Sequence, residues 1–192
     1  MAASLSAPAL SAAPAVMPAS LSAGRGMADF PAAARMLIEK DELLSLLPHK
    51  GKMLLLNRIT EYDVNRGFLC SEYDMSGDCL FYDPALGGAP AWMSFEFMAQ
   101  SVSALSGLTG RIMGKPPMLG FILSVSSFEI KTPVLRPGET VRTSISEVTR
   151  VGMVSTFRCT VFQGEAEVSS CQLMLMDVED PYVYIGKDSY GK

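Results

Sequence analysis

The sequence predicts an α+β protein in which one curved antiparallel β-sheet wraps around a single long helix. Apolar residues recur at three- to four-residue spacing over one long stretch, residues 91–109. Shorter apolar segments with strand-like alternation lie before and after it. A single helix cannot bury its own apolar face, so we expect it to pack against the sheet that these strands form.

The 192-residue chain is long enough for one domain with extensions, and its composition is that of a globular protein. Residues 1–36 are dominated by Ala, Ser, Pro, Leu and Met, and no basic segment precedes their apolar stretch, as a secretory signal would require. We therefore expect a disordered leader over 1–36, one domain over 37–180 and a flexible tail over 181–192.

Three short segments are expected ahead of the long helix. Residues 38–47 predict an amphipathic helix, and residues 52–60 predict a strand because they contain a Met-Leu-Leu-Leu run. Residues 67–73 predict a second strand with alternating side chains. Residues 76–90 are rich in Gly, Pro and Asp and predict a loop.

The long helix is expected to begin after Pro90 and to end near Gly107 and Gly110. Strands follow it, with Gly-containing turns between them: 118–125 and 126–131, separated by a bend or bulge, then 140–150, 153–163 and 166–177. An open sheet of this kind leaves an edge strand and a groove, which dimerisation commonly covers.

Composition excludes several classes of function. The net charge is −4 and no basic run is present, which argues against nucleic-acid binding. No apolar run is long enough to cross a membrane, and we expect a cytoplasmic protein. The four cysteines form no CxxC pair and only one histidine is present, so neither a zinc site nor any other metal site is expected. No phosphate-binding glycine fingerprint is present, and no cofactor is expected.

Glu96 is the most prominent candidate for chemistry, because it interrupts the apolar stretch 92–99. Burial in an apolar groove would favour the protonated form and hold this side chain ready as a general acid. Gln100 follows four residues later on the same helical face, where its amide could orient the carboxylate. The alternative is a solvent-facing Glu/Gln pair on a surface helix.

Four further residues are candidates. Ala91 begins the helix, where free backbone amides can bind an oxyanion. His49, the single histidine, is a base candidate by its titration range, although a histidine in a turn is more often structural. Tyr82, in the loop fourteen residues ahead of Glu96, could donate a hydrogen bond to a substrate or simply pack. Gly120 is a candidate substrate contact on the strand after the helix.

Three segments resemble motifs of the bacterial 3-hydroxyacyl-[acyl-carrier-protein] dehydratases. Residues 47–58 resemble their LPHRxPMLLVDR segment, residues 90–100 their central-helix motif PGVLxxEAMAQ, and residues 128–139 their xFKxPVxPGD segment. The resemblance spans residues 44–177 and is strongest with the dehydratase-like proteins of aryl-polyene and related polyketide clusters. It implies the hotdog fold, a curved antiparallel sheet wrapped around one central helix.

The resemblance also implies roles. In these dehydratases a histidine in a GHFP loop removes the α-proton, the helix Glu or Asp of the other subunit protonates the departing 3-hydroxyl, and an amide at the helix start binds the thioester oxygen. Glu96 matches the acid, Gln100 its neighbour and Ala91 the amide donor. No GHFP sequence is present, and Tyr82 stands at the position of the base. A neutral phenol is a poor base at neutral pH.

Three interpretations remain open. His49 replaces the missing base, giving a dehydratase that converts a 3-hydroxyacyl thioester of acyl carrier protein or coenzyme A to the trans-2-enoyl thioester in fatty-acid, polyketide or aryl-polyene biosynthesis. Alternatively, the chain is a homodimer or heterodimer subunit, and a related hotdog subunit supplies the histidine. Finally, the chain is a hotdog thioesterase or a non-catalytic acyl-carrier-binding protein.

Overall fold

The structure is a computed structural model that describes residues 37–115 and 119–178, so the predicted leader and tail lie outside the described residues. The helices are α1 (Lys40–Leu46), the short 3-10 helices η1 (Gly51–Met53) and η2 (Ala91–Met93), and α2 (Ser94–Ile112). The strands are β1 (Ile38–Glu39), β2 (Arg58–Asp63), β3 (Phe68–Asp74), β4 (Ala89–Pro90), β5 (Leu119–Ile130), β6 (Val134–Leu135), β7 (Thr140–Val151), β8 (Val154–Gln163) and β9 (Ala166–Val178).

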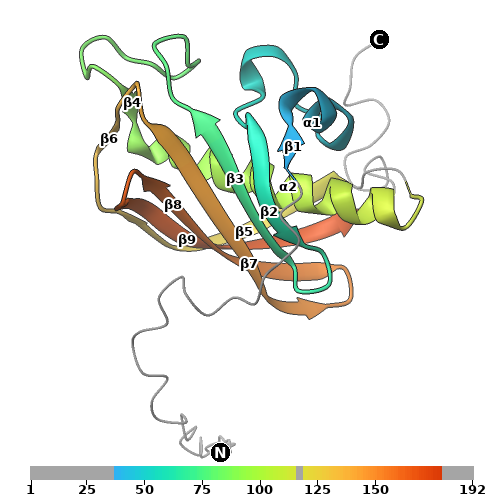
Figure 1. Ribbon diagram of the computed structural model, residues 1–192. Helices are drawn as coiled ribbons and strands as arrows, with labels where there is room; N and C mark the ends of the chain where they lie inside the picture. Colours follow the sequence, from blue (N-terminus) through green and yellow to red (C-terminus); the bar gives the residue numbers. More distant parts are fainter. Residues whose placement is uncertain (1–36, 116–118, 179–192) are drawn as a thin grey trace, which may run out of the picture. The chain divides into compact units, whose positions relative to one another are not determined.

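One antiparallel sheet runs in the order β1-β2-β3-β7-β8-β9-β5, and α2 lies against it (Figure 1). The helix and the sheet share one core, to which fully buried side chains contribute from both sides: Phe97, Met98 and Ala104 from α2, and Leu69, Ile145 and Leu173 from the strands. This arrangement confirms the predicted α+β fold of a sheet wrapped around one long helix. No described helix is long and apolar enough to cross a membrane.

The predicted hairpins after the helix are confirmed. Gly152 and Gly164 connect β7 to β8 and β8 to β9 with φ of 60° and 57°, a left-handed conformation that glycine adopts without strain. The predicted bend between residues 125 and 126 is a β-bulge in β5, where the register against β9 shifts between Ser126 and Glu129. Ser127 has a φ of 52° at this bulge.

The prediction of a strand over residues 52–60 is wrong for residues 52–57, because β2 begins only at Arg58. The three leucines of the run, Leu54 to Leu56, are buried without regular secondary structure. The backbone amide of Leu55 donates a hydrogen bond to the Gln100 side chain at 2.9 Å, so this segment lies against α2 and not beside a strand.

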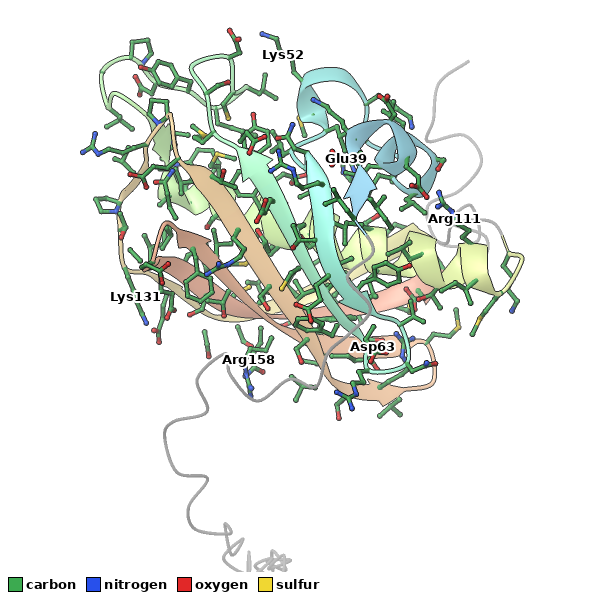
Figure 2. The ribbon with its side chains drawn as sticks, viewed as in Figure 1. Glu39, Lys52, Asp63, Arg111, Lys131 and Arg158 are labelled. Atoms are coloured by element: carbon green, nitrogen blue, oxygen red, sulfur yellow. The ribbon has the colours of Figure 1, made fainter. Side chains whose placement is uncertain are left out.

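The predicted end of the long helix is also corrected, because α2 continues through Gly107 and Gly110 to Ile112. At Gly107, a Cβ atom would lie 2.4 Å from the backbone oxygen of Leu46, so the glycine allows α1 to approach α2 closely. Arg111, labelled in Figure 2, lies near the end of α2. It forms an ion pair with Glu42 and donates a hydrogen bond to Ser45 Oγ at 2.7 Å. These contacts hold α1, and the His49 segment that follows it, against α2.

Candidate functional site

The structure brings Glu96 and His49 together within one chain. Glu96 lies in the first turn of α2, and His49 lies between α1 and η1. His49 Nε2 is 3.6 Å from Glu96 Oε1, just beyond a direct hydrogen bond. Both side chains are about three-quarters buried, with 28% and 26% of their surfaces exposed. Glu96 is therefore not the solvent-facing residue of the alternative interpretation.

Gln100 fixes the Glu96 carboxylate. Its Nε2 donates to Glu96 Oε1 at 2.8 Å and to the Met53 carbonyl oxygen at 2.7 Å, while its Oε1 accepts from the Leu55 amide. Gln100 is 0% exposed. The predicted helical neighbour is thus a buried clamp that joins the Glu96 carboxylate to the segment carrying His49. The hydrogen bonds from Gln100 to the backbone of Met53 and Leu55 could not be predicted from the sequence, because backbone groups carry no residue-specific pattern.

Glu96 and His49 line a cavity of about 290 Å³. Gly120, a predicted substrate contact, lines the same cavity from β5. Apolar side chains from α2, β5 and β9 form much of the remaining wall: Val102, Ile122 and Leu175. An acid, a histidine and an apolar channel in one cavity suit a substrate with a reactive polar end and a hydrophobic chain. Among residues 37–115 and 119–178, no group of three His, Cys, Asp or Glu side chains converges as a metal site would require.

Ala91 does not present a free amide. Its N–H donates to the Pro133 carbonyl oxygen at 2.9 Å, beside the short β4–β6 pair, and the residue is 1% exposed. A thioester oxygen could therefore reach this amide only by displacing Pro133. The expected oxyanion role of Ala91 has no support from this arrangement.

Tyr82 also does not line the cavity that contains Glu96. It is partly buried against the hydrophobic core, in the loop before β4. The structure thus joins Glu96, His49, Gln100 and Gly120, and leaves Ala91 and Tyr82 outside this group.

Asp177 was missed by sequence reasoning, although it lines the cavity near the end of β9. Its Oδ2 accepts a hydrogen bond from Arg150 Nη1 at 3.1 Å. The alternation along 171–177 carried a signal, because Cys171, Leu173 and Leu175 point into the core and Asp177 is the next residue in that series.

Comparison with known proteins agrees with this architecture. A family model described as ApeP dehydratase matches residues 42–185. The chain belongs to the ApeP-like dehydratase family. The resemblance read from the three motifs is thereby confirmed, as is a dehydratase-like function of the kind it implied.

Individual relatives support the same family. The 3-hydroxyacyl-[acyl-carrier-protein] dehydratase FabZ of Bartonella quintana is 26% identical over 144 residues, covering 74% of this chain and 91% of the relative. The FabZ of Bartonella bacilliformis is 28% identical over 141 residues, covering 72% and 89%. The solved structure of the dehydratase heterocomplex ApeI:P from Xenorhabdus doucetiae superimposes with a TM-score of 0.66 at 17% identity, covering 73% of this chain and 93% of the other. This likeness establishes the hotdog fold.

Proposed function

We propose that the chain dehydrates a 3-hydroxyacyl thioester, carried by acyl carrier protein or coenzyme A, to the trans-2-enoyl thioester, with Glu96 as general acid and His49 as general base. The observation that carries this proposal is the 3.6 Å separation of His49 Nε2 and Glu96 Oε1 in one partly apolar cavity. The names of the FabZ relatives support the substrate class. We place this activity in the cytoplasm.

The two groups suit a reaction at two adjacent carbons. His49 Nε2 takes the proton from C2, and the electron pair of that C–H bond forms the C2–C3 double bond. The C3–O bond breaks while its oxygen takes the proton of Glu96, and water leaves. The imidazolium and the carboxylate remain, and after the product leaves, a proton passes from His49 to solvent while Glu96 Oε2 takes one from solvent, which restores both groups.

Gln100 is a positioning residue in this scheme. Its Nε2 donates to Glu96 Oε1, so in the acid form the proton resides on Oε2, the oxygen that Gln100 leaves free for the substrate. The Leu55 amide and the Met53 carbonyl fix the orientation of the Gln100 amide group. The carboxylate is therefore held in one rotamer before the substrate enters.

The experiment is a dehydration assay with the purified full chain and a 3-hydroxybutyryl carrier thioester, following formation of the enoyl product. We expect Glu96→Gln to lower kcat by about 10²- to 10⁴-fold, the usual contribution of a general acid. His49→Ala should produce a loss of similar size. Glu165→Gln, an exposed site in the β8–β9 turn, is the matched control and should retain full activity. Unchanged turnover in Glu96→Gln would refute the proposal, and release of free thiol in place of enoyl product would indicate a thioesterase.

A second candidate function is that of a subunit whose base comes from a partner. Two observations favour it: Tyr82 stands where the family places its loop histidine, and β5 is an unpaired edge of the described sheet. Along β5, large apolar side chains are exposed, namely Ile122, Leu123, Val125, Phe128 and Ile130. Edge strands of this kind pair with another chain. We propose that a second hotdog chain, identical or related, adds its sheet at β5.

This partner proposal is tested by sedimentation of the full chain, alone and mixed with a related hotdog subunit. We expect Val125→Lys on β5 to lower the fraction of dimer, because the charge would be buried at the interface. Val148→Lys on β7, at another exposed valine, should leave assembly unchanged. Full activity of His49→Ala in the mixed complex, with no activity of the chain alone, would assign the base to the partner.

A further inference from the structure

Two buried side-chain polar atoms have no hydrogen-bond partner among the described residues, His49 Nδ1 and Ser155 Oγ. Buried polar atoms are nearly always paired, so each unpaired one calls for an explanation. His49 belongs to the site described above. Ser155 lines a different cavity, of about 410 Å³, further along α2.

The two cavities adjoin each other. Val102, Ser106, Leu175 and Asp177 line both. Together they form one groove that follows α2 from the level of Glu96 to that of Met113. Glu96 and Met113 are separated by about 25 Å along the helix axis, at a rise of about 1.5 Å per residue. The Ser155 cavity is therefore the distal part of the groove that contains Glu96 and His49.

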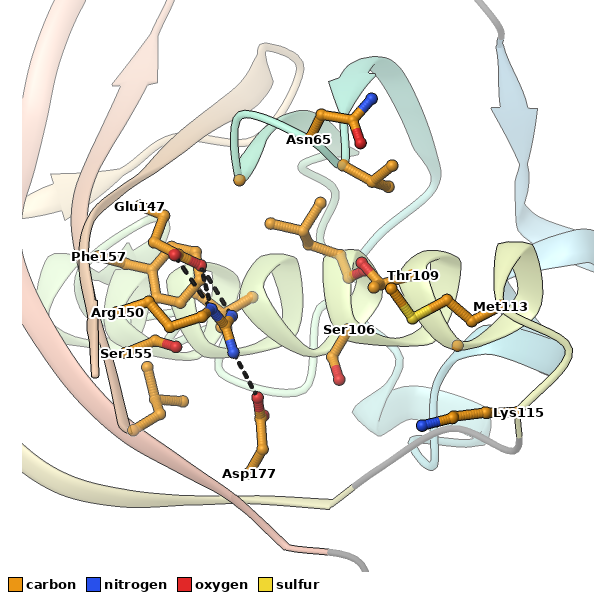
Figure 3. A pocket seen from close by; sticks show the side chains of 16 residues that line it. Asn65, Ser106, Thr109, Met113, Lys115, Glu147, Arg150, Ser155, Phe157 and Asp177 are labelled. Carbon is orange, nitrogen blue, oxygen red and sulfur yellow. Dashed lines mark hydrogen bonds and ion pairs between the residues drawn. The ribbon is translucent and has the colours of Figure 1, made fainter. Parts of the chain in front are cut away.

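The distal cavity has an apolar wall and a polar wall. Leu105 and Phe157 contribute to the apolar side. The polar side is an ion cluster in which Arg150 Nη2 lies 2.7 Å from Glu147 Oε2, and Arg150 Nη1 lies 3.1 Å from Asp177 Oδ2 (Figure 3). Figure 3 shows Ser155 among the side chains that line this cavity, together with Arg150 and Asp177.

Ser155 occupies a position where the fold otherwise places apolar side chains. On β8 the following inward-facing residues are Phe157, Cys159 and Val161, and all are buried. Other buried serines of the core are paired: Ser71 Oγ with Ser101 Oγ at 2.8 Å, and Ser94 Oγ with Ser169 Oγ at 2.5 Å. A buried hydroxyl without a partner costs free energy, and a ligand that reaches it removes that cost.

The charges identify the kind of ligand. Four charged residues line the distal cavity, and the negative Glu147 and Asp177 balance the positive Arg150 and Lys115. An anionic chain end would face two carboxylates, and a cationic one would compete with an arginine that both carboxylates already hold. A neutral group that both donates and accepts hydrogen bonds fits Ser155 and the cluster without adding a charge.

We propose that the distal cavity binds a neutral hydrogen-bonding group, a hydroxyl, at the far end of the substrate's acyl chain. The inference rests on the proposed function, since it takes the groove to hold an acyl thioester. The cavity begins at Val102, about 9 Å along the helix from Glu96. An extended chain advances by roughly 1.25 Å per carbon–carbon bond, so the bonds from C3 to the end of a chain of about twelve carbons span roughly 11 Å and carry its last carbons past the start of the cavity.

The test compares two ligands in a double-mutant cycle. The probes are two pantetheine amides. The first carries 3-hydroxydodecanoic acid, whose chain ends in a methyl group, and the second carries 3,12-dihydroxydodecanoic acid, whose chain ends in a hydroxyl group. Calorimetry with the full chain, or with its complex if a partner is required, gives the ratio of the two Kd values. We expect Ser155→Ala to shift this ratio by about three- to tenfold in favour of the methyl-ended ligand, the range of one net hydrogen bond. Ser170→Ala, on the opposite face of the sheet, should leave the ratio unchanged.

An identical ratio of the two Kd values in the wild type and in Ser155→Ala overturns the inference. It would show that the terminal hydroxyl of the bound ligand makes no contact with Ser155. Failure of both ligands to bind overturns it as well. Thermal melting establishes that Ser155→Ala is folded. The 3-hydroxybutyryl thioester needs only the cavity of Glu96 and His49. Its dehydration by the wild type therefore tests the proposed function independently of the distal cavity.

Discussion

Replacement of Gln100 by leucine is the sharpest test of how the Glu96 site is held. Gln100 is 0% exposed and forms three hydrogen bonds, to Glu96 Oε1, the Met53 carbonyl and the Leu55 amide. Leucine is apolar and of similar size, so it fills the space but makes none of these bonds. The variant therefore separates the contribution of these hydrogen bonds to stability from the contribution of side-chain packing.

The magnitude follows from the groups left unpaired. The Leu55 amide belongs to a residue with 0% exposure, and an unpaired buried amide costs about 1–3 kcal/mol. The Met53 carbonyl belongs to an exposed residue and can turn to water, so its loss adds at most about 1 kcal/mol. We expect Gln100→Leu to lower the free energy of unfolding by about 1–4 kcal/mol.

Urea unfolding at 25 °C, fitted with an unchanged slope, measures this difference directly. The corresponding fall in Tm is on the order of 10 °C for a domain of this size. Gln172→Leu is the matched control, because Gln172 is exposed on β9, and it should change the free energy of unfolding by less than about 0.5 kcal/mol. Equal stability of the two variants would refute the reasoning, since Leu55 would then not depend on Gln100.

Two further predictions concern the scaffold. Gly107→Ala should destabilise the protein by about 1–2 kcal/mol despite the better helix propensity of alanine, because the new Cβ would lie 2.4 Å from Leu46 O. The control in the same urea experiment is Gly77→Ala, whose new Cβ would have no atom within 4 Å. The Arg58 hydrogen bonds hold the pKa of Asp74 below its ordinary value. This pair therefore stabilises the fold above about pH 4, and its contribution is lost as pH falls through the lowered pKa. The wild type should be more stable than Arg58→Met by at most about 1 kcal/mol, because the pair is partly exposed. This difference in the free energy of unfolding should shrink as the pH is lowered from 6 to 3. A difference that stays constant over this range would exclude the linkage.

The sequence by itself determined the elements whose signals are local. Helical periodicity located α2, and alternating residues between Gly152 and Gly164 located the hairpin strands. Three motifs, including the one around Glu96, indicated the family, because the residues of each motif lie within one segment. Each of these signals depends on neighbours in the chain, and a period or a turn residue is visible without knowing the fold.

Only the tertiary structure decided how distant segments combine. It placed His49 beside Glu96, and it turned the Met-Leu-Leu-Leu run from a predicted strand into a buried segment hydrogen-bonded to Gln100. It also paired the Ala91 amide with Pro133 and, within residues 37–115 and 119–178, left the Ser155 hydroxyl without a hydrogen-bond partner. These outcomes depend on which surfaces remain after the sheet has closed around the helix. Contacts between segments tens of residues apart follow from that packing, and no local pattern encodes them.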